Sequence, residues 1–228
     1  MDDFTFRVEV VRTERKRSAS IRLEGDLVKV SVPKTLSDNR VRALVNKRTT
    51  WIKTKLKEQS ERPIVKPKEY ISGESFPYLG KNYRLKVIRG NAVSLKLKSG
   101  YLQATVEETD VNAQSTTQSL LLNWYLAHAE KRLTEKTQRW ADIIGVKPNA
   151  VSVKGYKSRW GSCSIQGDIS YNWRIILAPH HIIDYVIIHE LCHMLEHNHS
   201  ARFWSHVEQY APDWRDSRDW LKKNNLYF

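Results

Sequence analysis

The stretch from Asp184 to Trp204 constrains the fold most, because it joins a run of large apolar residues to a cluster of histidines. Apolar residues occupy most positions around the helical circumference from Tyr185 to Leu195, which predicts a buried helix. His189, Glu190 and His193 lie within this run and form the pattern H-E-x-x-H. The fold therefore has to bury a helix that carries two imidazoles and a carboxylate.

This spacing is typical of a metal site. Residues four apart stand above one another on one helix face, so His189 and His193 can direct two ring nitrogens at one ion. Glu190 lies about 100° around the helix from His189, which suits a general base beside the water better than a third ligand. Without a metal, two His and a Glu in so apolar a helix would lack partners at a considerable cost in free energy.

A catalytic zinc ion has three protein ligands and one open position, so a third ligand is needed. His197 continues the helical row but lies about 12 Å along the axis from His189, too far for three side chains on one straight helix to converge. Asn198 tolerates the left-handed conformation that ends many helices, and a stop there would let His199 approach from another direction. The predicted ligands of one zinc ion per chain are His189, His193 and His199, with His197 and Glu196 as alternatives.

The residues around this helix resemble the YgjP-like metal-dependent peptidases, relatives of SprT and of the Spartan type of DNA–protein-crosslink protease. The shared segments are Ser-Arg-Trp-Gly-Ser-Cys at 158–163, Asn-Trp-Arg at 172–174, Pro179, residues 184–193, Asn-His-Ser at 198–200, Phe-Trp at 203–204, Arg-Lys-Arg-Ser at 15–18 and Trp-Ile at 51–52. The resemblance implies a zinc peptidase fold in which His189, His193 and His199 are the ligands and Glu190 is the catalytic base. It leaves the substrate open beyond a polypeptide.

In such a mechanism Glu190 takes a proton as water attacks a carbonyl, and it can return that proton to the leaving amine. The tetrahedral intermediate also needs an electrophile besides zinc. The candidates for this role or for substrate contact are Arg159, Tyr156, Asn172 and Tyr210. The sequence does not rank these four residues.

Hydrophobic periodicity predicts an α+β chain in three parts, of which the first, residues 1–60, is a small sheet with a basic helix. Alternation predicts strands at 4–11, 21–23 and 27–32, with a hairpin turn at 24–26. A helix from Ser37 to about Gln59 follows, and many Lys and Arg occupy its polar face. Residues 60–68, with Pro63 and Pro67, have the composition of a linker.

The second part, residues 61–111, is predicted to be β-rich, with short strands at 69–71, 75–79, 82–89, 92–97 and 101–106. The third part, residues 112–228, is predicted to be a small zincin-like helical catalytic domain. It comprises a helix ending at Gly145, a short antiparallel sheet around residues 151–176, and the H-E-x-x-H helix from about His180 to His197. Ser200 is expected to cap the next helix, and a last helix ends near Asn224.

The chain is strongly basic, with a net charge of +13, and residues 1–68 hold 18 Lys and Arg against nine Asp and Glu. This balance favours anionic partners, so the amino-terminal part could recruit the enzyme to nucleic acid; ordinary solvated faces are the alternative. Two cysteines, Cys163 and Cys192, indicate a reducing compartment. No stretch has the apolar length of a membrane span, and the first residues do not resemble a secretory signal, so we expect a cytoplasmic protein with no membrane association.

Two alternatives to a zinc peptidase remain. The first is a nucleic-acid-binding module with a structural or vestigial zinc site, although such a site has no use for Glu190. The second is a metal-dependent nucleotide phosphohydrolase, which the absence of a phosphate-binding glycine-rich loop disfavours.

Overall fold

The computed structural model describes residues 4–15, 17–60 and 67–224. The chain is α+β, and it divides into two compact units, Met1–Lys66 and Pro67–Phe228. Most of the predicted linker, residues 61–66, lies outside the described residues. No helix in the described part of the chain is long and apolar enough to cross a membrane.

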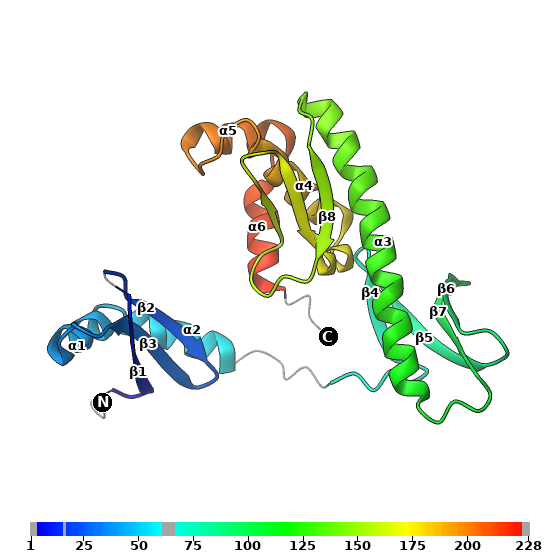
Figure 1. Cartoon of the computed structure of the whole chain (residues 1–228), viewed down its shortest axis with the longest axis horizontal. Helices are drawn as coiled ribbons and strands as arrows, with labels where there is room; N and C mark the ends of the chain where they lie inside the picture. The colour runs from blue at the N-terminus through cyan, green and yellow to red at the C-terminus, as the bar shows by residue number, and fades with distance from the viewer. Residues whose placement is uncertain (1–3, 16, 61–66, 225–228) are drawn as a thin grey trace. The chain divides into compact units, whose positions relative to one another are not determined.

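The amino-terminal unit is a three-stranded sheet with two helices (Figure 1). Its strands are β1 (Arg7–Thr13), β2 (Ser20–Glu24) and β3 (Leu27–Pro33), in the order β1-β3-β2. β1 runs parallel to β3, whereas β2 pairs with β3 as an antiparallel hairpin that turns at Gly25. One face of β3 and the helices enclose a small core of valines and Ile52, as the alternation in the sequence predicts.

The single basic helix expected from Ser37 to Gln59 is wrong, because the structure has two: α1 (Asp38–Lys47) and α2 (Thr49–Ser60). The helix breaks at Arg48, whose backbone leaves the helical conformation. The Thr49 hydroxyl donates a hydrogen bond of 3.1 Å to the carbonyl oxygen of Val45. Such bonds from Thr back to the preceding turn bend helices, and a second β-branched residue, Thr50, follows.

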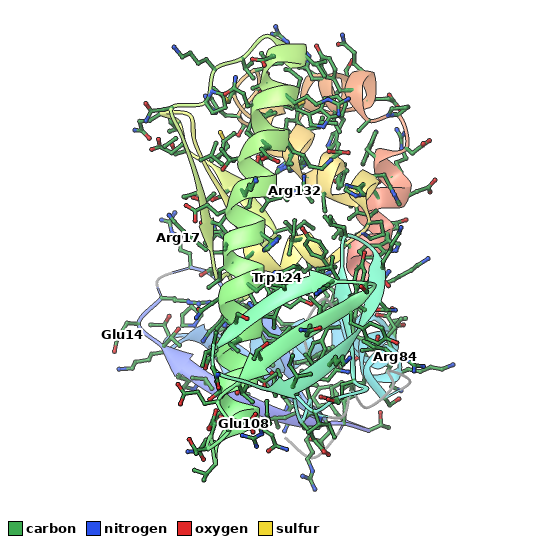
Figure 2. All side chains as sticks on the ribbon, turned by 90° about the vertical axis from the view of Figure 1, so that its right-hand side faces the viewer. Glu14, Arg17, Arg84, Glu108, Trp124 and Arg132 are labelled. Carbon is green, nitrogen blue, oxygen red and sulfur yellow. The ribbon has the colours of Figure 1, made fainter. Side chains whose placement is uncertain are left out.

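The second unit begins with a four-stranded sheet that packs on a long helix (Figures 1 and 2). Its strands are β4 (Ser75–Tyr78), β5 (Lys81–Arg89), β6 (Ser94–Lys98) and β7 (Tyr101–Val106), in the order β4-β5-β7-β6. The predicted strand at 69–71 is not formed, and β5 pairs with β7 in parallel. The helix α3 (Ala113–Ile144) ends at Gly145 in the left-handed conformation, as predicted.

One hydrophobic core runs through the whole second unit. Phe76, Leu85 and Leu102 of the sheet belong to the same buried cluster as Trp124 of α3 and residues of the H-E-x-x-H helix. Trp124, labelled in Figure 2, meets the ring of Tyr78 edge-on at a centroid distance of 4.8 Å. Residues 67–111 therefore share this core with the helices that follow. The division into domains 61–111 and 112–228 stays a prediction.

A second, smaller sheet lies on the other part of α3 and consists of β8 (Ala150–Lys154), β9 (Gly161–Cys163) and β10 (Asp168–Asn172), in the order β8-β10-β9. β9 and β10 form the expected antiparallel hairpin, but β8 pairs with β10 in parallel, so the sheet is mixed. The strand predicted to continue to Ile176 stops at Asn172, whose side-chain oxygen accepts from the backbone N–H of Arg174 and starts the 3₁₀ helix η1 (Trp173–Leu177).

Three helices complete the unit: α4 (His180–Cys192), α5 (Ala201–Tyr210) and α6 (Trp214–Lys223). Pro179 precedes α4, and the Ser200 hydroxyl accepts from the backbone N–H of Phe203, so both predicted helix starts are confirmed. Nine of the thirteen residues of α4 are buried, which makes it the central helix of this core.

The turn between β4 and β5 fixes where α4 begins. The backbone N–H groups of Leu79 and Gly80 donate to the carbonyl oxygens of Ile176 and Leu177, at 2.9 and 3.2 Å. Gly80 has a φ of +79°, and a Cβ atom on it would lie 2.7 Å from the Cα of Pro179. The turn therefore packs backbone against backbone at the start of α4, where only glycine fits.

Gly80→Ala should destabilise the second unit more than Gly100→Ala, which has the same φ of +79° but open space around its Cβ position. The matched control carries only the conformational cost of about 1–2 kcal/mol, whereas Gly80→Ala adds a steric cost of about 1–3 kcal/mol. Urea unfolding followed by tryptophan fluorescence measures the difference, since seven of the eight Trp lie in residues 67–228. Equal midpoints for the two variants would contradict this packing.

Candidate metal centre and adjoining cleft

The last turn of α4 places His189 and His193 on one face. His193 is the C-cap residue and keeps helical backbone angles, so the two histidines retain the four-residue helical spacing. Their ring centroids lie 5.0 Å apart. The buried, largely apolar body of α4 holds this pair in place.

The helix ends earlier than the sequence predicts, at Cys192 and not at His197. A tight turn follows, in which the N–H of Glu196 donates to the carbonyl of Cys192 and Nδ1 of His193 lies 3.3 Å from the carbonyl oxygen of Glu196. Among the described residues, the non-glycine positions with positive φ are Tyr70, Leu79 and Ser99, so the left-handed stop expected at Asn198 is wrong. The turn nevertheless returns the chain to α4.

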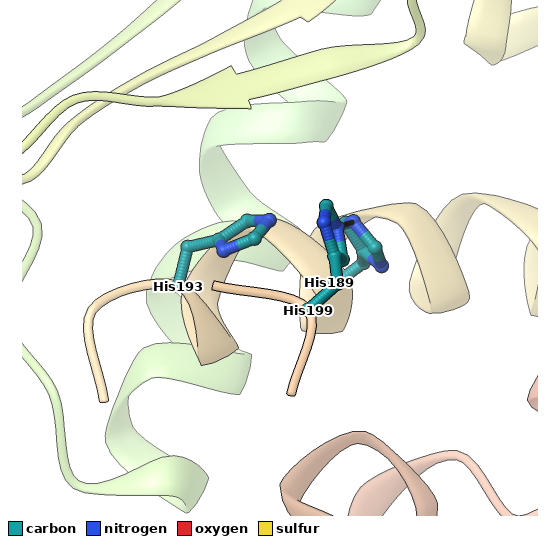
Figure 3. Close-up of side chains that lie close together, drawn as sticks. All are labelled: His189, His193 and His199. Carbon is teal, nitrogen blue, oxygen red and sulfur yellow. Dashed lines mark hydrogen bonds between the residues drawn. The ribbon is translucent and has the colours of Figure 1, made fainter. Parts of the chain in front are cut away.

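This return brings His199 to the other two histidines (Figure 3). One ligand atom from each of His189, His193 and His199, here called the histidine cluster, lies within 4.8 Å of the others. The Nε2 atoms of His189 and His199 are 3.1 Å apart. Two zinc ligands with bonds of 2.0–2.1 Å at a tetrahedral angle would be separated by about 3.3 Å, so the His189–His199 pair already has the spacing that a zinc ion needs.

The surroundings of His189 and His193 favour their neutral forms. Burial lowers the pKa of His189 to about 3, and the neighbouring His193 and His199 lower it further. The pKa of His193 is lowered as well, mainly by burial. The buried Nδ1 of His189 has no hydrogen-bond partner among the described residues. Neutral imidazoles close together are the donor set that zinc requires.

Phe203 on α5 supports all three imidazoles. Its ring is fully buried, with centroid distances of 5.0 Å to His189, 4.5 Å to His193 and 4.8 Å to His199. Trp204 lies beside it, stacked on His199 at 5.6 Å and on Trp214 at 4.1 Å. Phe203 and Trp204 thus limit the orientations that the imidazoles of the cluster can adopt.

Glu190 is buried beside the cluster, with 6% of its surface exposed. Burial raises its pKa to about 8, and the positive charge of Arg159 opposes that rise. Its side chain packs on Gly161 of β9, where an added Cβ would lie 2.6 Å from the carboxylate Oε1 and 2.7 Å from Cγ. The absence of a side chain at Gly161 therefore creates the space that Glu190 occupies.

Two hollows meet at the cluster and share His189, Glu190, His199 and Gly161. The first, of about 560 Å³, continues towards α6 and is also lined by Trp160, Tyr185, Val186, Trp204, Arg218, Leu221 and Lys222. The second, of about 350 Å³, follows β9 and is also lined by Ser162, Cys163, Ile165, His193 and His197. A chain that crosses the cluster can therefore find room on both sides of it.

The four candidates for transition-state or substrate contact lie in different surroundings. Arg159 is exposed, sits over the ring of Tyr156 at 5.3 Å and acts electrostatically on Glu190. Tyr156 lies 3.4 Å from the hydroxyl of Ser162, in the strand that borders the second hollow. Asn172 is fully buried and donates to the carbonyl oxygens of Tyr156 and Arg159, so its amide braces that loop. Tyr210 lines a separate hollow with Trp140 and Asp184.

Several cleft residues were not predicted as site residues. Trp160, Tyr185 and Arg218 line the first hollow, and the buried Nε of Arg218 has no hydrogen-bond partner among the described residues. Trp160 and Tyr185 belong to apolar patterns that indicate packing. Arg218 lies on α6, and nothing in the sequence places α6 beside α4. Of the alternative ligands, His197 lines the second hollow but is outside the histidine cluster, and the backbone of Glu196 is used in the turn.

Neither cysteine is in a disulfide. Cys192 is buried, as predicted, and burial raises its pKa to about 12. Cys163 lines the second hollow, where burial, Glu190 and Asp168 raise its pKa to about 11. Both are therefore protonated thiols at neutral pH, and Cys163 lies outside the histidine cluster.

Comparison with known proteins gave one family. A family model described as YgjP-like, metallopeptidase domain, matches residues 17–224. The crystal structure of the metallopeptidase zymogen of Pyrococcus abyssi abylysin is 24% identical, with 40% of this chain and 93% of that chain covered and a TM-score of 0.34. The crystal structure of the metallopeptidase zymogen of Methanocaldococcus jannaschii jannalysin is 15% identical, with 40% of this chain and 94% of that chain covered and a TM-score of 0.37. A search of curated proteins gave no match.

Gly161→Ala should displace the Glu190 carboxylate while leaving the histidine cluster able to bind metal, because the contact is with the glutamate alone. We expect peptide hydrolysis to fall at least about tenfold, since a misplaced catalytic group costs about two orders of magnitude in rate. Metal content and turnover are compared with those of Gly155→Ala, where a Cβ meets nothing within 4 Å. Equal activity in the two variants would show that Gly161 does not position Glu190.

Proposed function

The chain belongs to the YgjP-like metallopeptidase family, and from this premise we propose that it cleaves polypeptides with one zinc ion held by the histidine cluster. Glu190 is the general base in this proposal. The observation that carries it is the meeting of three imidazoles and one buried glutamate side chain at the junction of two hollows. Zinc bound there would supply a Lewis acid for the scissile carbonyl and activate a water at neutral pH.

The protein's own contribution is proton transfer and positioning. Glu190 takes a proton from the attacking water and delivers it to the leaving amine nitrogen. Its burial favours the protonated form, which would hold the proton for the second step, whereas the positive charge of zinc bound beside it would favour the ionised carboxylate that the first step needs. The packing of Gly161 against its side chain limits the orientations that the carboxylate can adopt. Phe203 limits those of the three imidazoles.

We place the substrate along β9, the edge strand of the β8-β10-β9 sheet. An extended peptide can add to such an edge through main-chain hydrogen bonds, with alternate side chains entering pockets. Gly161 on β9 touches Glu190, so a peptide on this edge would pass directly beside the base. The two hollows would then receive residues on either side of the cleaved bond.

Arg159 is the group we propose for stabilising negative charge as the carbonyl is attacked. Its charge acts on Glu190, and its side chain is free to approach from the exposed loop before β9. Asn172 holds that loop through the carbonyl oxygens of Tyr156 and Arg159, so its role is positioning. Tyr156 lies beside Ser162 on β9 and is placed to contact a peptide there.

The site supports catalysis better than a structural role for the metal. Structural zinc sites have four protein ligands, whereas the histidine cluster offers three in the described part of the chain.

Recruitment to nucleic acid through the basic amino-terminal unit also remains a hypothesis. In its favour is the charge of residues 1–68. Against it, the side chains of Arg12, Lys29, Lys34 and Lys55 are each paired with a carboxylate.

Protein purified without chelator should contain about one zinc ion per chain, as expected for a site with three His ligands and one open position. His199→Ala should lose the metal, because its Nε2 lies 3.1 Å from that of His189. His197→Ala is the matched control from the same loop and should keep it. Elemental analysis of the wild type and the two variants measures their zinc content. Loss of metal in His197→Ala alone would require a different ligand set.

Glu190→Gln should reduce peptide hydrolysis by about 100- to 10,000-fold, the contribution typical of a general base, and leave zinc content unchanged. The amide fills the same space against Gly161 but cannot accept the proton from water. Turnover is measured on unfolded protein and on nucleoside triphosphates in parallel, because Arg218 and Lys222 line the first hollow. Hydrolysis of the triphosphate alone would replace the peptidase proposal with a phosphohydrolase, and full activity of the variant would exclude Glu190 as the base.

A further inference from the structure

The outer face of the four-stranded sheet is a cationic surface that the metal site does not use. One face of the sheet packs into the core through Phe76, Leu85 and Leu102, which are almost completely buried. Figure 2 views the sheet with α3 behind it, and the labelled Arg84 lies on it. Strands β4 to β7 contain six Lys and Arg and no Asp or Glu. The sheet therefore exposes positive charge uncompensated by acidic residues within its strands.

Strand register arranges this charge in two rows. In the first row, Tyr101 of β7 has Arg84 of β5 as its partner on one side and Lys98 of β6 on the other. In the second row, Gln103 lies between Lys86 and Lys96. Neighbouring strands are about 4.8 Å apart and alternate residues about 6.7 Å apart, so the four cations surround one patch of sheet. We call Arg84, Lys86, Lys96, Lys98 and Tyr101 the sheet patch.

The charges of the sheet patch are unpaired. Among the described residues, none of its four cations forms a hydrogen bond or a salt bridge, and all four side chains are exposed. Tyr101 is 44% exposed between two of them. Acidic residues follow β7 at Glu107 and Glu108, beyond its final residue, Val106. Four uncompensated positive charges around an exposed aromatic ring form a surface that attracts anionic ligands.

The chemistry of the patch matches single-stranded nucleic acid. Exposed rings on β-sheets stack bases, and flanking Lys and Arg neutralise phosphates; the four-stranded sheets of RNA-binding domains stack two or three bases in this way. An anionic membrane would require more apolar surface than the patch offers, since Tyr101 is its only large hydrophobic side chain. Acidic motifs are typically recognised by clusters of Arg, whereas three of the four cations here are Lys and they surround an exposed aromatic ring.

We propose that the sheet patch binds single-stranded nucleic acid, with Tyr101 stacking on a base and Arg84, Lys86, Lys96 and Lys98 contacting phosphates. The shared chemistry of RNA and DNA, a base next to a phosphodiester, is what the patch recognises. This binding is independent of zinc and of Glu190, and it belongs to the second unit, in contrast to the recruitment expected of the amino-terminal unit.

The test measures binding of the full-length protein to fluorescein-labelled oligo(dT) and oligo(U) by fluorescence anisotropy across a salt series. The wild type should bind one or both single strands, and hairpin duplexes more weakly. The variant with Arg84, Lys86, Lys96 and Lys98 all changed to Gln should lose most of this affinity, and its salt slope should fall by about 3, since each phosphate contact contributes roughly 0.7. Tyr101→Ala should weaken binding about 5- to 150-fold with the slope unchanged, and Tyr101→Phe should retain it.

The matched control removes the same charge from the amino-terminal unit, with Arg22, Arg40, Lys47 and Lys53 changed to Gln; these side chains are exposed and outside the salt bridges of the described residues. Loss of binding only in the sheet variant, with unchanged thermal unfolding and peptide hydrolysis, supports the proposal. Equal loss in both variants, loss only in the control, or binding to phosphatidylserine vesicles without binding to oligonucleotides would each overturn it.

Discussion

A carboxylate held inside a hydrophobic core is the constraint on which the candidate site depends. Glu190 extends from a helix whose neighbouring residues Ile187, Ile188 and Leu191 are buried, and it is itself almost inaccessible. Burying a charge without partners costs far more free energy than a single hydrogen bond returns, so the group retains its proton more tightly and the pKa rises. The surrounding structure stabilises this arrangement through the packing of α4 against α3, α5, α6 and β9.

The same constraint explains why β9 has to approach α4 so closely. Gly161 is paired with Tyr171 of β10, and that strand is anchored in the core by Ile169 and Tyr171. The hairpin thus holds a backbone segment without a side chain against the carboxylate. A larger residue would push the strand edge, and any peptide bound to it, away from the base. The glycine therefore couples substrate position to the position of the catalytic group.

Features governed by local signals could be predicted from the sequence. The start of α4 after Pro179, the end of α3 at Gly145 and the Ser200 cap each depend on the conformation of one residue and its neighbours. The two histidines of α4 follow from helical periodicity alone. A turn after the helix predicts that His199 lies near them, and such a turn exists. It begins after Cys192 and does not use a left-handed Asn198.

The errors and omissions have tertiary causes. The end of α4 depends on the turn in which His193 and the carbonyl of Glu196 come together, a contact no propensity describes. Asn172 has the appearance of a substrate-binding amide, yet a buried amide must satisfy its own hydrogen bonds, and the nearby loop carbonyls do so. Arg218 enters the cleft only because α6 packs on α4. The partners of Asn172 and Arg218 lie at distant positions in the chain, and one sequence does not reveal them.

The positions of the positive charges matter for binding as well as their number. The amino-terminal third holds most of the excess positive charge, so composition alone favours nucleic-acid binding there. In the structure several of those cations lie against carboxylates, as Arg12 does with Asp38 at 2.6 Å, and a paired cation has less free energy to gain from a phosphate. The sheet in the second unit carries fewer cations, but the parallel register of β5 with β7 aligns Arg84 with Tyr101, and the antiparallel β6 adds Lys98. Binding depends on how many charges can act together on one ligand, and that number is set by strand order.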